Sequence, residues 1–378
     1  MAGIYIHIPF CKQACYYCNF HFTTSLRRKN ELVAALLSEL DLRKGYLEDE
    51  PVQTIYLGGG TPSLLDAGHL RLLMEKILGN YNVIARAEIT LETNPDDIAD
   101  DKLKAWKEIG IDRLSIGIQS FFDEDLKWMN RAHSASQAMR SLELAKEYFD
   151  NISIDLIYGL PLLTHEKWKK TFDKAILYNI PHLSCYALTI EAKTPLHKMI
   201  RQNQAADISP ERQSEQFLSL MSWAEKAGYE HYEISNFAKP GLRSRHNSSY
   251  WTGQKYLGIG PSAHSFNSRE RQWNISNNTI YIDSIKKGLI PYEKETLTAV
   301  QQLNEYIMTS LRTKEGLHLS GLKKEVSYEL RTASRKYVER GLMVKEGNYL
   351  RLTTEGKLLA DGIAADLFVI EGATRVIL

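Results

Sequence analysis

The stretch QTIYLGGGT, residues 53–61, joins a short apolar run to a glycine-rich turn. Its β-branched and aromatic residues are typical of a buried strand, which the glycines end. Polar or glycine-containing turns also follow three later strand-like runs: Glu92-Thr93-Asn94-Pro95, Gln119-Ser120 and Tyr158-Gly159-Leu160-Pro161. The strand ends of a parallel barrel meet at one mouth where ligands bind, whereas an open doubly wound sheet gathers only some of them. The pattern therefore favours a barrel.

Six strand-like runs alternate with helical patterns over the first 230 residues. The predicted strands are Gly3–Ile8, Gln53–Leu57, Ala87–Leu91, Arg113–Ile118, Ile152–Ile157 and His182–Leu188. The predicted helices cover residues 32–40, 64–78, 101–109, 135–148, 166–178 and 210–227. Because each helical crossover returns the chain in the same direction, the strands should be parallel. Six units are fewer than the eight of a closed barrel, so we expect an α/β fold with a partial (β/α)6 barrel, open on one side.

The alternation divides the chain into three predicted parts. Residues 1–235 form the barrel, and residues 236–295 form a loop-rich connecting segment with short strands. Residues 296–378 form a small α+β accessory domain. Its helices precede two strand-like runs around Glu346-Gly347-Asn348, as in a winged helix.

The length and composition of the chain exclude several classes of protein. With 378 residues the chain is too long for a single small module. It has 47 basic and 46 acidic side chains and is 43% hydrophobic, which excludes a disordered tail protein and a strongly basic nucleic-acid coat protein. No apolar run is long enough for a transmembrane helix, and residues 3–10 lack the basic leader and cleavage site of a signal peptide. We expect a cytoplasmic protein.

Three of the four cysteines fall within eight residues: Cys11, Cys15 and Cys18. A tight cluster in a reducing compartment indicates metal or redox chemistry rather than a disulfide framework. Three thiolates at this spacing can bind three irons of one cubane cluster and leave the fourth iron open. The alternative is a structural zinc ion, for which His7 or His21 would supply the fourth ligand.

Four sequence strings resemble the radical S-adenosylmethionine (SAM) superfamily. They are YIHIPFC at 5–11, GGGTP at 58–62, IDLIYGLP at 154–161 and HNSSYW at 246–251. Together they are similar to the oxygen-independent coproporphyrinogen oxidases and their relatives, the HemW haem chaperones, over nearly the whole chain. The resemblance implies a 4Fe–4S cluster and SAM, whose sulfonium bond is cleaved by one electron from the cluster to give a 5′-deoxyadenosyl radical.

The resemblance also implies which residues bind SAM: Tyr17, Gly59, Gly60, Thr61, Glu92, Gln119, Arg131 and Asp155. The glycines would let the backbone approach the methionine moiety and donate N–H groups to its carboxylate; alternatively they only form a tight turn. Tyr17 would pack near the adenine or merely anchor its loop. Arg131 and Asp155 would meet charged and hydroxyl groups of SAM, or form an internal ion pair.

Tyr5 and His7 alternate with isoleucines, so both point to one face of the first strand. Tyr5 is expected near the cluster, and His7 is either there or in the core. Phe20 stands where the oxidases carry a fourth cysteine, and the chain begins ten residues before Cys11, whereas the oxidases have a longer leading segment. Both differences favour the HemW-like branch.

That branch is thought to bind haem and pass it to acceptor proteins. His246 is the first candidate for the haem ligand, with Tyr250 and Trp251 packing against the porphyrin. Alternatively, His246 pins its loop to the barrel, and His264 or Cys185 binds the iron.

The resemblance leaves other functions open. Coproporphyrinogen oxidation, an oxidative decarboxylation of propionate side chains, is the second function, although Phe20 disfavours it; an RNA-modifying protein is the third. The resemblance implies a haem acceptor protein and a small electron donor such as flavodoxin or ferredoxin as partners. It is compatible with peripheral membrane contact, but the modest basic excess at residues 312–357 does not favour nucleic acid.

Overall fold

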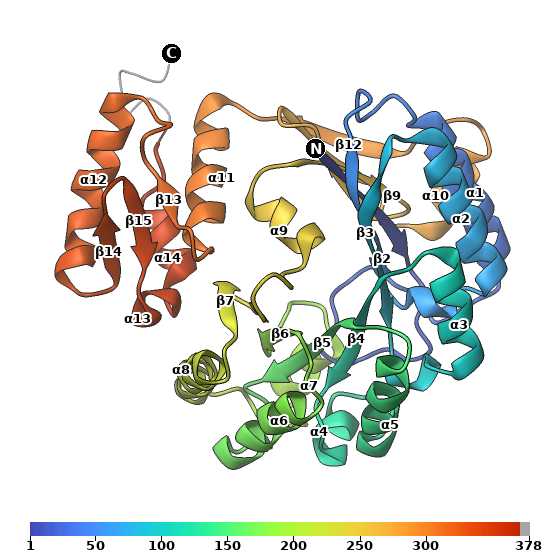
Figure 1. Cartoon of the computed structure of the whole chain (residues 1–378), viewed down its shortest axis with the longest axis horizontal. Coiled ribbons are helices and arrows are strands. Elements are labelled where there is room, and N and C mark those ends of the chain that lie inside the picture. The colour runs from blue at the N-terminus through green and yellow to red at the C-terminus, as the bar shows by residue number, and fades with distance from the viewer. Residues whose placement is uncertain (371–378) are drawn as a thin grey trace.

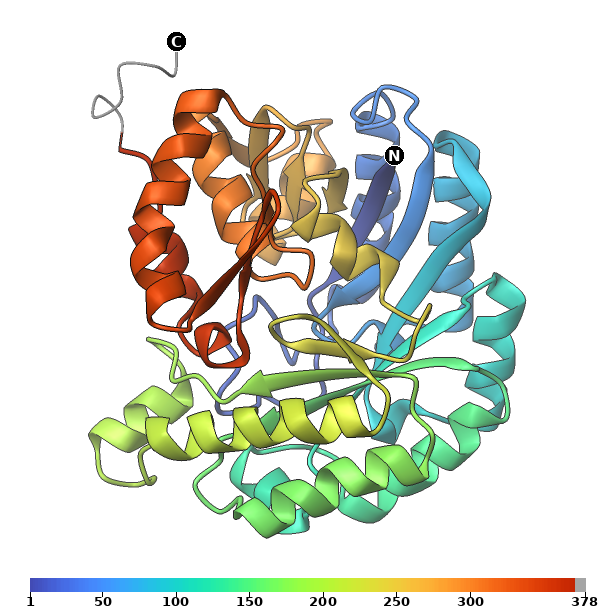
Figure 2. The same ribbon diagram turned by 60° about the vertical axis from the view of Figure 1, so that its left-hand side comes forward.

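A twelve-stranded sheet forms the centre of the computed structural model, which describes residues 1–370 (Figure 1). Six parallel strands follow one another in chain order: β1 (Ala2–Ile8), β2 (Val52–Gly59), β3 (Val83–Thr93), β4 (Arg113–Gln119), β5 (Asn151–Tyr158) and β6 (His182–Ala187). Helices lie outside the curved sheet (Figure 2): α1 (Lys29–Leu42), α2 (Ala67–Asn80), α3 (Asp100–Ile109), α5 (Ala135–Lys146), α6 (His165–Leu177) and α8 (Pro210–Lys226). The predicted partial barrel is confirmed.

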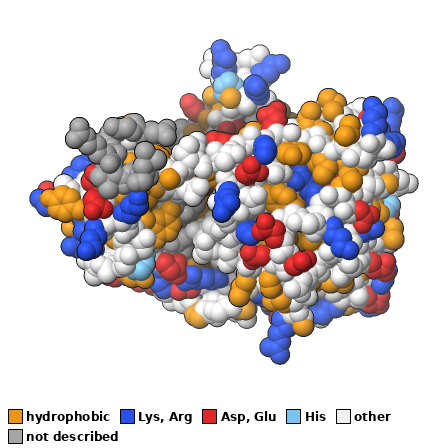
Figure 3. All heavy atoms as spheres, turned by 90° about the horizontal axis from the view of Figure 1, so that it is seen from above, with side chains coloured by type: hydrophobic (Ala, Val, Ile, Leu, Met, Phe, Trp, Pro, Cys, Tyr) orange, Lys and Arg blue, Asp and Glu red, His pale blue; other side chains and the backbone are white. Residues whose placement is uncertain are grey.

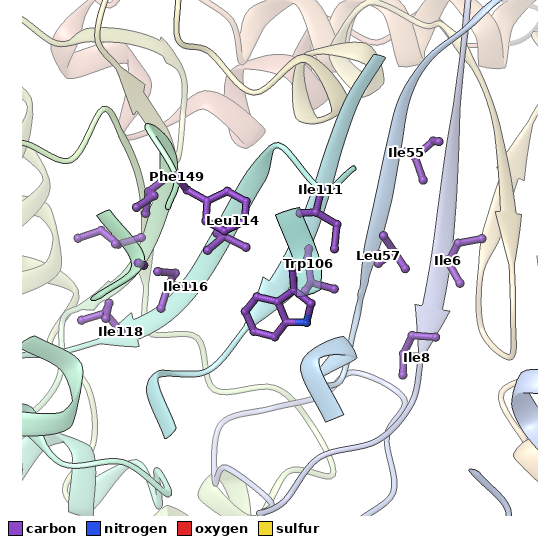
Figure 4. Packing of buried hydrophobic residues seen from close by; sticks show 14 of the residues in the cluster. Ile6, Ile8, Ile55, Leu57, Trp106, Ile111, Leu114, Ile116, Ile118 and Phe149 are labelled. Atoms are coloured by element: carbon purple, nitrogen blue, oxygen red, sulfur yellow. The ribbon is translucent and has the colours of Figure 1, made fainter. Parts of the chain in front are cut away.

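Strand alternation decides which side chains face the helices. Ile4, Ile6 and Ile8 of β1 are fully buried in the main core, and Figure 4 shows two of them beside Ile55 and Leu57 of β2. The residues between them face the barrel interior. The sheet thus has an apolar outer face under the helices and a polar inner face.

Several short elements are absent from the prediction. They include α4 (Asp123–Trp128), α7 (Pro195–Arg201), α9 (Arg245–Trp251) and α10 (Asn278–Ile285). None is longer than eight residues, so each is too short to show a clear helical period.

Residues 230–296 extend the barrel sheet at both edges. At one edge β8 (Asn236–Ala238) pairs antiparallel with β6, and β7 (Glu230–Glu233) pairs antiparallel with β8. At the other edge β9 (Lys255–Ile259) pairs in parallel with β1, followed by the antiparallel strands β10 (His264–Phe266), β11 (Glu270–Asn274) and β12 (Tyr292–Thr296). The predicted boundary at residue 235 therefore runs through one sheet, and the segment expected to be loop-rich shares the barrel core.

A buried ion pair fastens this extension to the barrel. Glu39 of α1 is fully buried and accepts hydrogen bonds from Arg43 Nε at 2.9 Å, Asn274 Nδ2 at 2.8 Å, Gly260 N at 2.8 Å and Tyr281 Oη at 2.5 Å. Four donors surround one carboxylate, which supplies the pairing that a buried charge requires.

The C-terminal part has its own small core. It contains α11 (Ala299–Leu311), α12 (Lys324–Glu339), α13 (Thr354–Lys357) and α14 (Ala360–Asp366) around a sheet of β13 (Leu317–His318), β15 (Tyr349–Leu352) and β14 (Met343–Glu346). The β14–β15 hairpin lies where the sequence predicts it. The last eight residues of the predicted 296–378 domain, 371–378, lie outside the described residues.

Opposite charges are mixed on the molecular surface. Figure 3 shows Lys and Arg interspersed with Asp and Glu on the face seen from above. Over residues 1–370, no helix has both the length and the apolar character that a membrane crossing requires.

Candidate functional site

Three free thiols lie on the loop after β1, at the mouth of the barrel. Cys11, Cys15 and Cys18 are half-buried and line one cavity of about 430 Å³. The backbone N–H of Cys11 donates to the carbonyl of Thr23 at 3.0 Å, and that of Cys18 to the carbonyl of Cys15 at 3.2 Å. The structure thus brings the predicted cluster ligands to one cavity.

A chain of side-chain hydrogen bonds connects two of the sulfurs. Thr61 Oγ1 donates to Cys11 Sγ at 3.7 Å and accepts from Asn94 Nδ2 at 3.0 Å. Arg131 donates to Asn94 Oδ1 at 2.5 Å and to Cys15 Sγ at 3.4 Å. Thr61 and Arg131 are predicted site residues, whereas Asn94 is not, although it stands in a quoted strand-end turn. Hydrogen bonds to sulfur help set the reduction potential of an iron–sulfur cluster.

Burial controls the protonation of the thiols. It raises the pKa of Cys11 to about 11 and also raises the pKa of Cys18. Both thiols are therefore protonated at neutral pH without metal, and a bound metal deprotonates a coordinating thiol.

The glycine turn after β2 packs directly on the cysteine loop. A Cβ atom at Gly60 would lie 2.6 Å from the carbonyl oxygen of Phe10 and 3.0 Å from Cys11 Sγ. Gly59 has a φ of 112°, which L side chains rarely adopt, and its Cβ would lie 2.8 Å from the His7 ring. Glycine at these positions lets the two loops approach each other.

Hydrogen bonds within the protein occupy both glycine N–H groups. Gly59 donates to Glu92 Oε2 at 3.1 Å, and Gly60 donates to the carbonyl of Ile8 at 2.9 Å. Their predicted hydrogen bonds to a ligand carboxylate stay a prediction. In this structure the two glycines allow close packing of the two loops.

Two half-buried carboxyl groups face the same cavity. Glu92 accepts from Tyr56 Oη at 2.7 Å, and Asp155 accepts from Ser115 Oγ at 3.4 Å. Burial raises the pKa of Glu92 to about 7 and that of Asp155 to about 6. Within the described residues no ion pair joins Asp155 to Arg131, which binds Asn94 and Cys15 instead. A cationic or hydroxyl-bearing ligand would satisfy both acids.

Gln119 and Tyr17 also line the cavity of the thiols. Gln119 ends β4 with a φ of 64°, an unusual conformation for a residue other than glycine, and such strain often marks functional sites. Tyr17 packs against the main core, so it anchors its loop while facing the cavity. Its predicted contact with adenine stays a prediction.

Tyr5 and His246 lie in a second cavity of about 470 Å³, not beside the thiols. The two cavities share Glu92 and Tyr186. The hydroxyl of Tyr5 bonds to His7 Nδ1 at 3.1 Å. Alternation along β1 correctly placed Tyr5 and His7 on one face, but did not reveal that Tyr5 lines the second cavity whereas His7 lines neither cavity.

Both ring nitrogens of His246 are already hydrogen-bonded. Nδ1 bonds to Thr54 Oγ1 at 2.8 Å, and Nε2 bonds to Tyr250 Oη at 2.9 Å. Burial lowers its pKa to about 3, so the ring is neutral. His246 thus holds α9 against β2, as in the structural alternative, and it would have to release one of these bonds to bind iron.

The other metal candidates lie apart from the thiols. His7 Nε2 bonds to the carbonyl of His21, and neither ring lines the cavity of the cysteines. Cys185 is buried in the main core, and His264 lines neither cavity. Within residues 1–370 no three Cys, His, Asp or Glu side chains are arranged around one metal ion. A cubane does not need such a set, because its three thiolates bind three different irons.

Phe20 lies at the rim of the first cavity. It lines that cavity, yet 68% of its surface is exposed. Phe20, which stands where the resemblance implies a fourth cysteine in the oxidases, thus places an apolar ring at the cavity mouth.

The barrel and its three-cysteine loop define a radical SAM protein, and comparisons with known proteins agree. Residues 5–175 match the model of the radical SAM superfamily, and residues 297–359 match that of the HemN C-terminal domain. Coproporphyrinogen III oxidase (HemN) from Escherichia coli has the same fold, with a TM-score of 0.84 and 24% identity over 97% of this chain and 90% of that one.

Two curated relatives match over nearly their full lengths. Heme chaperone HemW of Bacillus subtilis is 33% identical over 96% of this chain and 98% of its own. Heme chaperone HemW of Escherichia coli is 31% identical over 98% of each chain. The chain belongs to the HemW family of radical SAM proteins.

Membership in the superfamily implies a 4Fe–4S cluster and SAM, and the residues fit both. Cys11, Cys15 and Cys18 would hold the cluster, with Thr61 and Arg131 donating to two of the sulfurs. When bound, the cluster would supply electrons for the chemistry of SAM. The two acids with raised pKa values, Glu92 and Asp155, would supply acceptors for the charged and hydroxyl groups of SAM.

Gly60→Ala should weaken SAM binding at least tenfold, about 1.4 kcal/mol. The added methyl group would push against Phe10 and Cys11, so the cysteine loop must move. Equilibrium dialysis of the reconstituted protein measures the affinity. Gly79→Ala is the matched control, since a Cβ atom there meets nothing within 4 Å. Equal SAM affinity in Gly60→Ala and wild type would contradict the assigned role.

Glu92→Gln should change the pH dependence of stability in the protein free of SAM. The pKa of Glu92 rises from 4.5 to about 7 on folding, so the folded state holds this proton more tightly. Its contribution is present below pH 4.5 and is lost as the pH rises through 7. Urea unfolding from pH 5 to 8 should show the wild type losing stability relative to Glu92→Gln. Parallel pH profiles would exclude the raised pKa.

Proposed function

We propose that this protein binds haem and transfers it to acceptor proteins, as heme chaperones do. The observation that carries the proposal is the match over nearly full length to relatives named heme chaperone HemW. The apolar Phe20 at the cavity mouth supports it, because the sequence resemblance implies a fourth cysteine of the oxidases at this position. The likeness to coproporphyrinogen III oxidase concerns the fold, and one fold can carry different activities.

We also propose a cellular compartment and partner proteins for this protein. Three free thiols that must take up a cluster favour a reducing compartment, so we place the protein in the cytoplasm. Its partners would be a haem acceptor protein and a small electron donor such as flavodoxin or ferredoxin.

One paired experiment tests the function. The reduced, reconstituted protein is incubated with SAM and coproporphyrinogen, and in parallel it is titrated with haem and followed by absorbance. We expect stoichiometric haem binding without conversion of coproporphyrinogen. Turnover to protoporphyrinogen would overturn the assignment in favour of the oxidase, and absence of haem binding would remove it altogether.

A further inference from the structure

The second cavity lies between the barrel and the start of the C-terminal part. It is lined from the barrel side by Tyr5, Tyr56, Glu92 and Tyr186, and from the segments that follow by Glu233, Ser235, Asn236, His246, Asn247, Tyr250, Trp251 and Arg312. Its volume of about 470 Å³ is within the range of cavities that bind small molecules. Binding of the 4Fe–4S cluster and SAM, which we assign to the first cavity, leaves this second cavity without an assigned ligand.

One wall of this cavity is aromatic. The rings of Tyr56 and His246 stack with centroids 4.9 Å apart, and Tyr250 meets His246 edge to face at 5.1 Å. The two hydrogen bonds of His246 fix this stack, since one partner lies on β2 and the other on α9. The wall is a preformed surface on which a flat, apolar ligand can pack.

Another part of the cavity, called the polar end below, is lined by polar side chains whose hydrogen bonds are incomplete. Three buried atoms there have no hydrogen-bond partner among residues 1–370: Glu233 Oε2, Asn236 Oδ1 and Arg312 Nε. Glu233 and Asn236 are each at least 96% buried, so solvent does not satisfy them. Buried polar atoms without partners are costly, which indicates that a ligand or ordered water completes this end.

Arg312 gives the polar end its positive charge. Its guanidinium carbon lies 5.3 Å from the centroid of the Trp251 ring, and its other end pairs with the exposed Asp361. A guanidinium binds a carboxylate more specifically than other side chains do. Burial also raises the pKa of Glu233, which reduces the repulsion that an incoming carboxylate would meet.

A ligand suited to this cavity has a flat apolar body and an acidic edge. We propose that the second cavity is the haem site, with the macrocycle on the aromatic wall and a propionate at Arg312. The proposal rests on the proposed function and gives it a location. Because Glu92 and Tyr186 belong to both cavities, haem there would lie next to the SAM site.

This placement gives His246 a positioning role. Its ring holds the wall through Thr54 and Tyr250 and does not need to bind the iron. A haem spectrum in His246→Gln with the same ligand bands as the wild type would agree with this role, whereas loss of those bands with the fold intact would assign iron binding to His246.

Cavity-filling variants test the location. Ser235→Phe and Asn247→Trp place a ring in the second cavity at side chains that line it. Both should lower haem affinity at least tenfold in an absorbance titration while leaving the iron and sulfide content of the cluster unchanged. Thr252→Phe is the matched control, because Thr252 is exposed at the end of α9 and lines neither cavity.

A comparison of ligands tests the polar end without relying on those variants. Haem should bind the wild type at least tenfold more tightly than its dimethyl ester, and Arg312→Gln should abolish most of that preference. Equal affinities for the acid and the ester in wild type would overturn the role of Arg312. Wild-type haem affinity in both filled variants would overturn the location but leave the proposed function standing. A wild type that binds no haem would remove both.

Discussion

Replacing Cys11, Cys15 or Cys18 with alanine should abolish the 4Fe–4S cluster after anaerobic reconstitution. Each thiol lines the same cavity, and within the described residues no other cysteine lies there to replace a lost ligand. A cubane held by two thiolates has two open irons and is expected to disassemble. Iron and sulfide analysis should fall to background, together with the visible absorbance of the cluster.

Cys185→Ala is the matched control for this experiment. Cys185 is a free cysteine too, but it is buried in the main core and lines neither cavity. Its replacement should leave iron and sulfide content unchanged. A cluster that persists in the triple variant of Cys11, Cys15 and Cys18 would show that the cluster is held elsewhere.

Glu39→Ala should lower the free energy of unfolding by about 3–5 kcal/mol. The change removes the carboxylate that binds Arg43, Asn274, Gly260 and Tyr281, and it leaves the buried Arg43 charge without its partner. Urea or guanidinium unfolding followed by circular dichroism measures the effect.

Glu31→Ala separates this effect from the general loss of a charged residue on α1. Glu31 pairs with Arg28 and Lys286 at the surface, where water screens both pairs. We expect little change in unfolding. If Glu39→Ala were as stable as Glu31→Ala, the buried network would not fasten residues 255–296 to the barrel.

The barrel could be predicted because its strands are long enough to show a pattern. All six parallel strands overlap their predicted ranges. The largest difference is in β3, which begins at Val83 rather than at the predicted Ala87. The pairing of β9 with β1 could not be predicted, because it joins residues about 250 positions apart and β9 has only five residues. No local period reveals such a contact.

The candidate site likewise has residues that could be predicted from the sequence and residues that could not. The cysteines and strand-end residues were identifiable from spacing and resemblance, and the structure gathers most of them in one cavity. Asn94 was missed because its role depends on two partners from other loops, Thr61 and Arg131. The second cavity was missed because Glu233 and Arg312 lie far apart in the sequence and carry no motif.

The parallel pairing of β1 with β9 also affects the order in which the protein can be assembled on the ribosome. One edge of β1, whose following loop carries the three cysteines, is unpaired until residues 255–259 have been synthesised. Contacts of such large sequence separation form late in folding. A chain truncated at residue 254 should therefore be digested rapidly near residue 11 in limited proteolysis and should retain little iron. Cluster insertion would then follow synthesis of about two thirds of the chain.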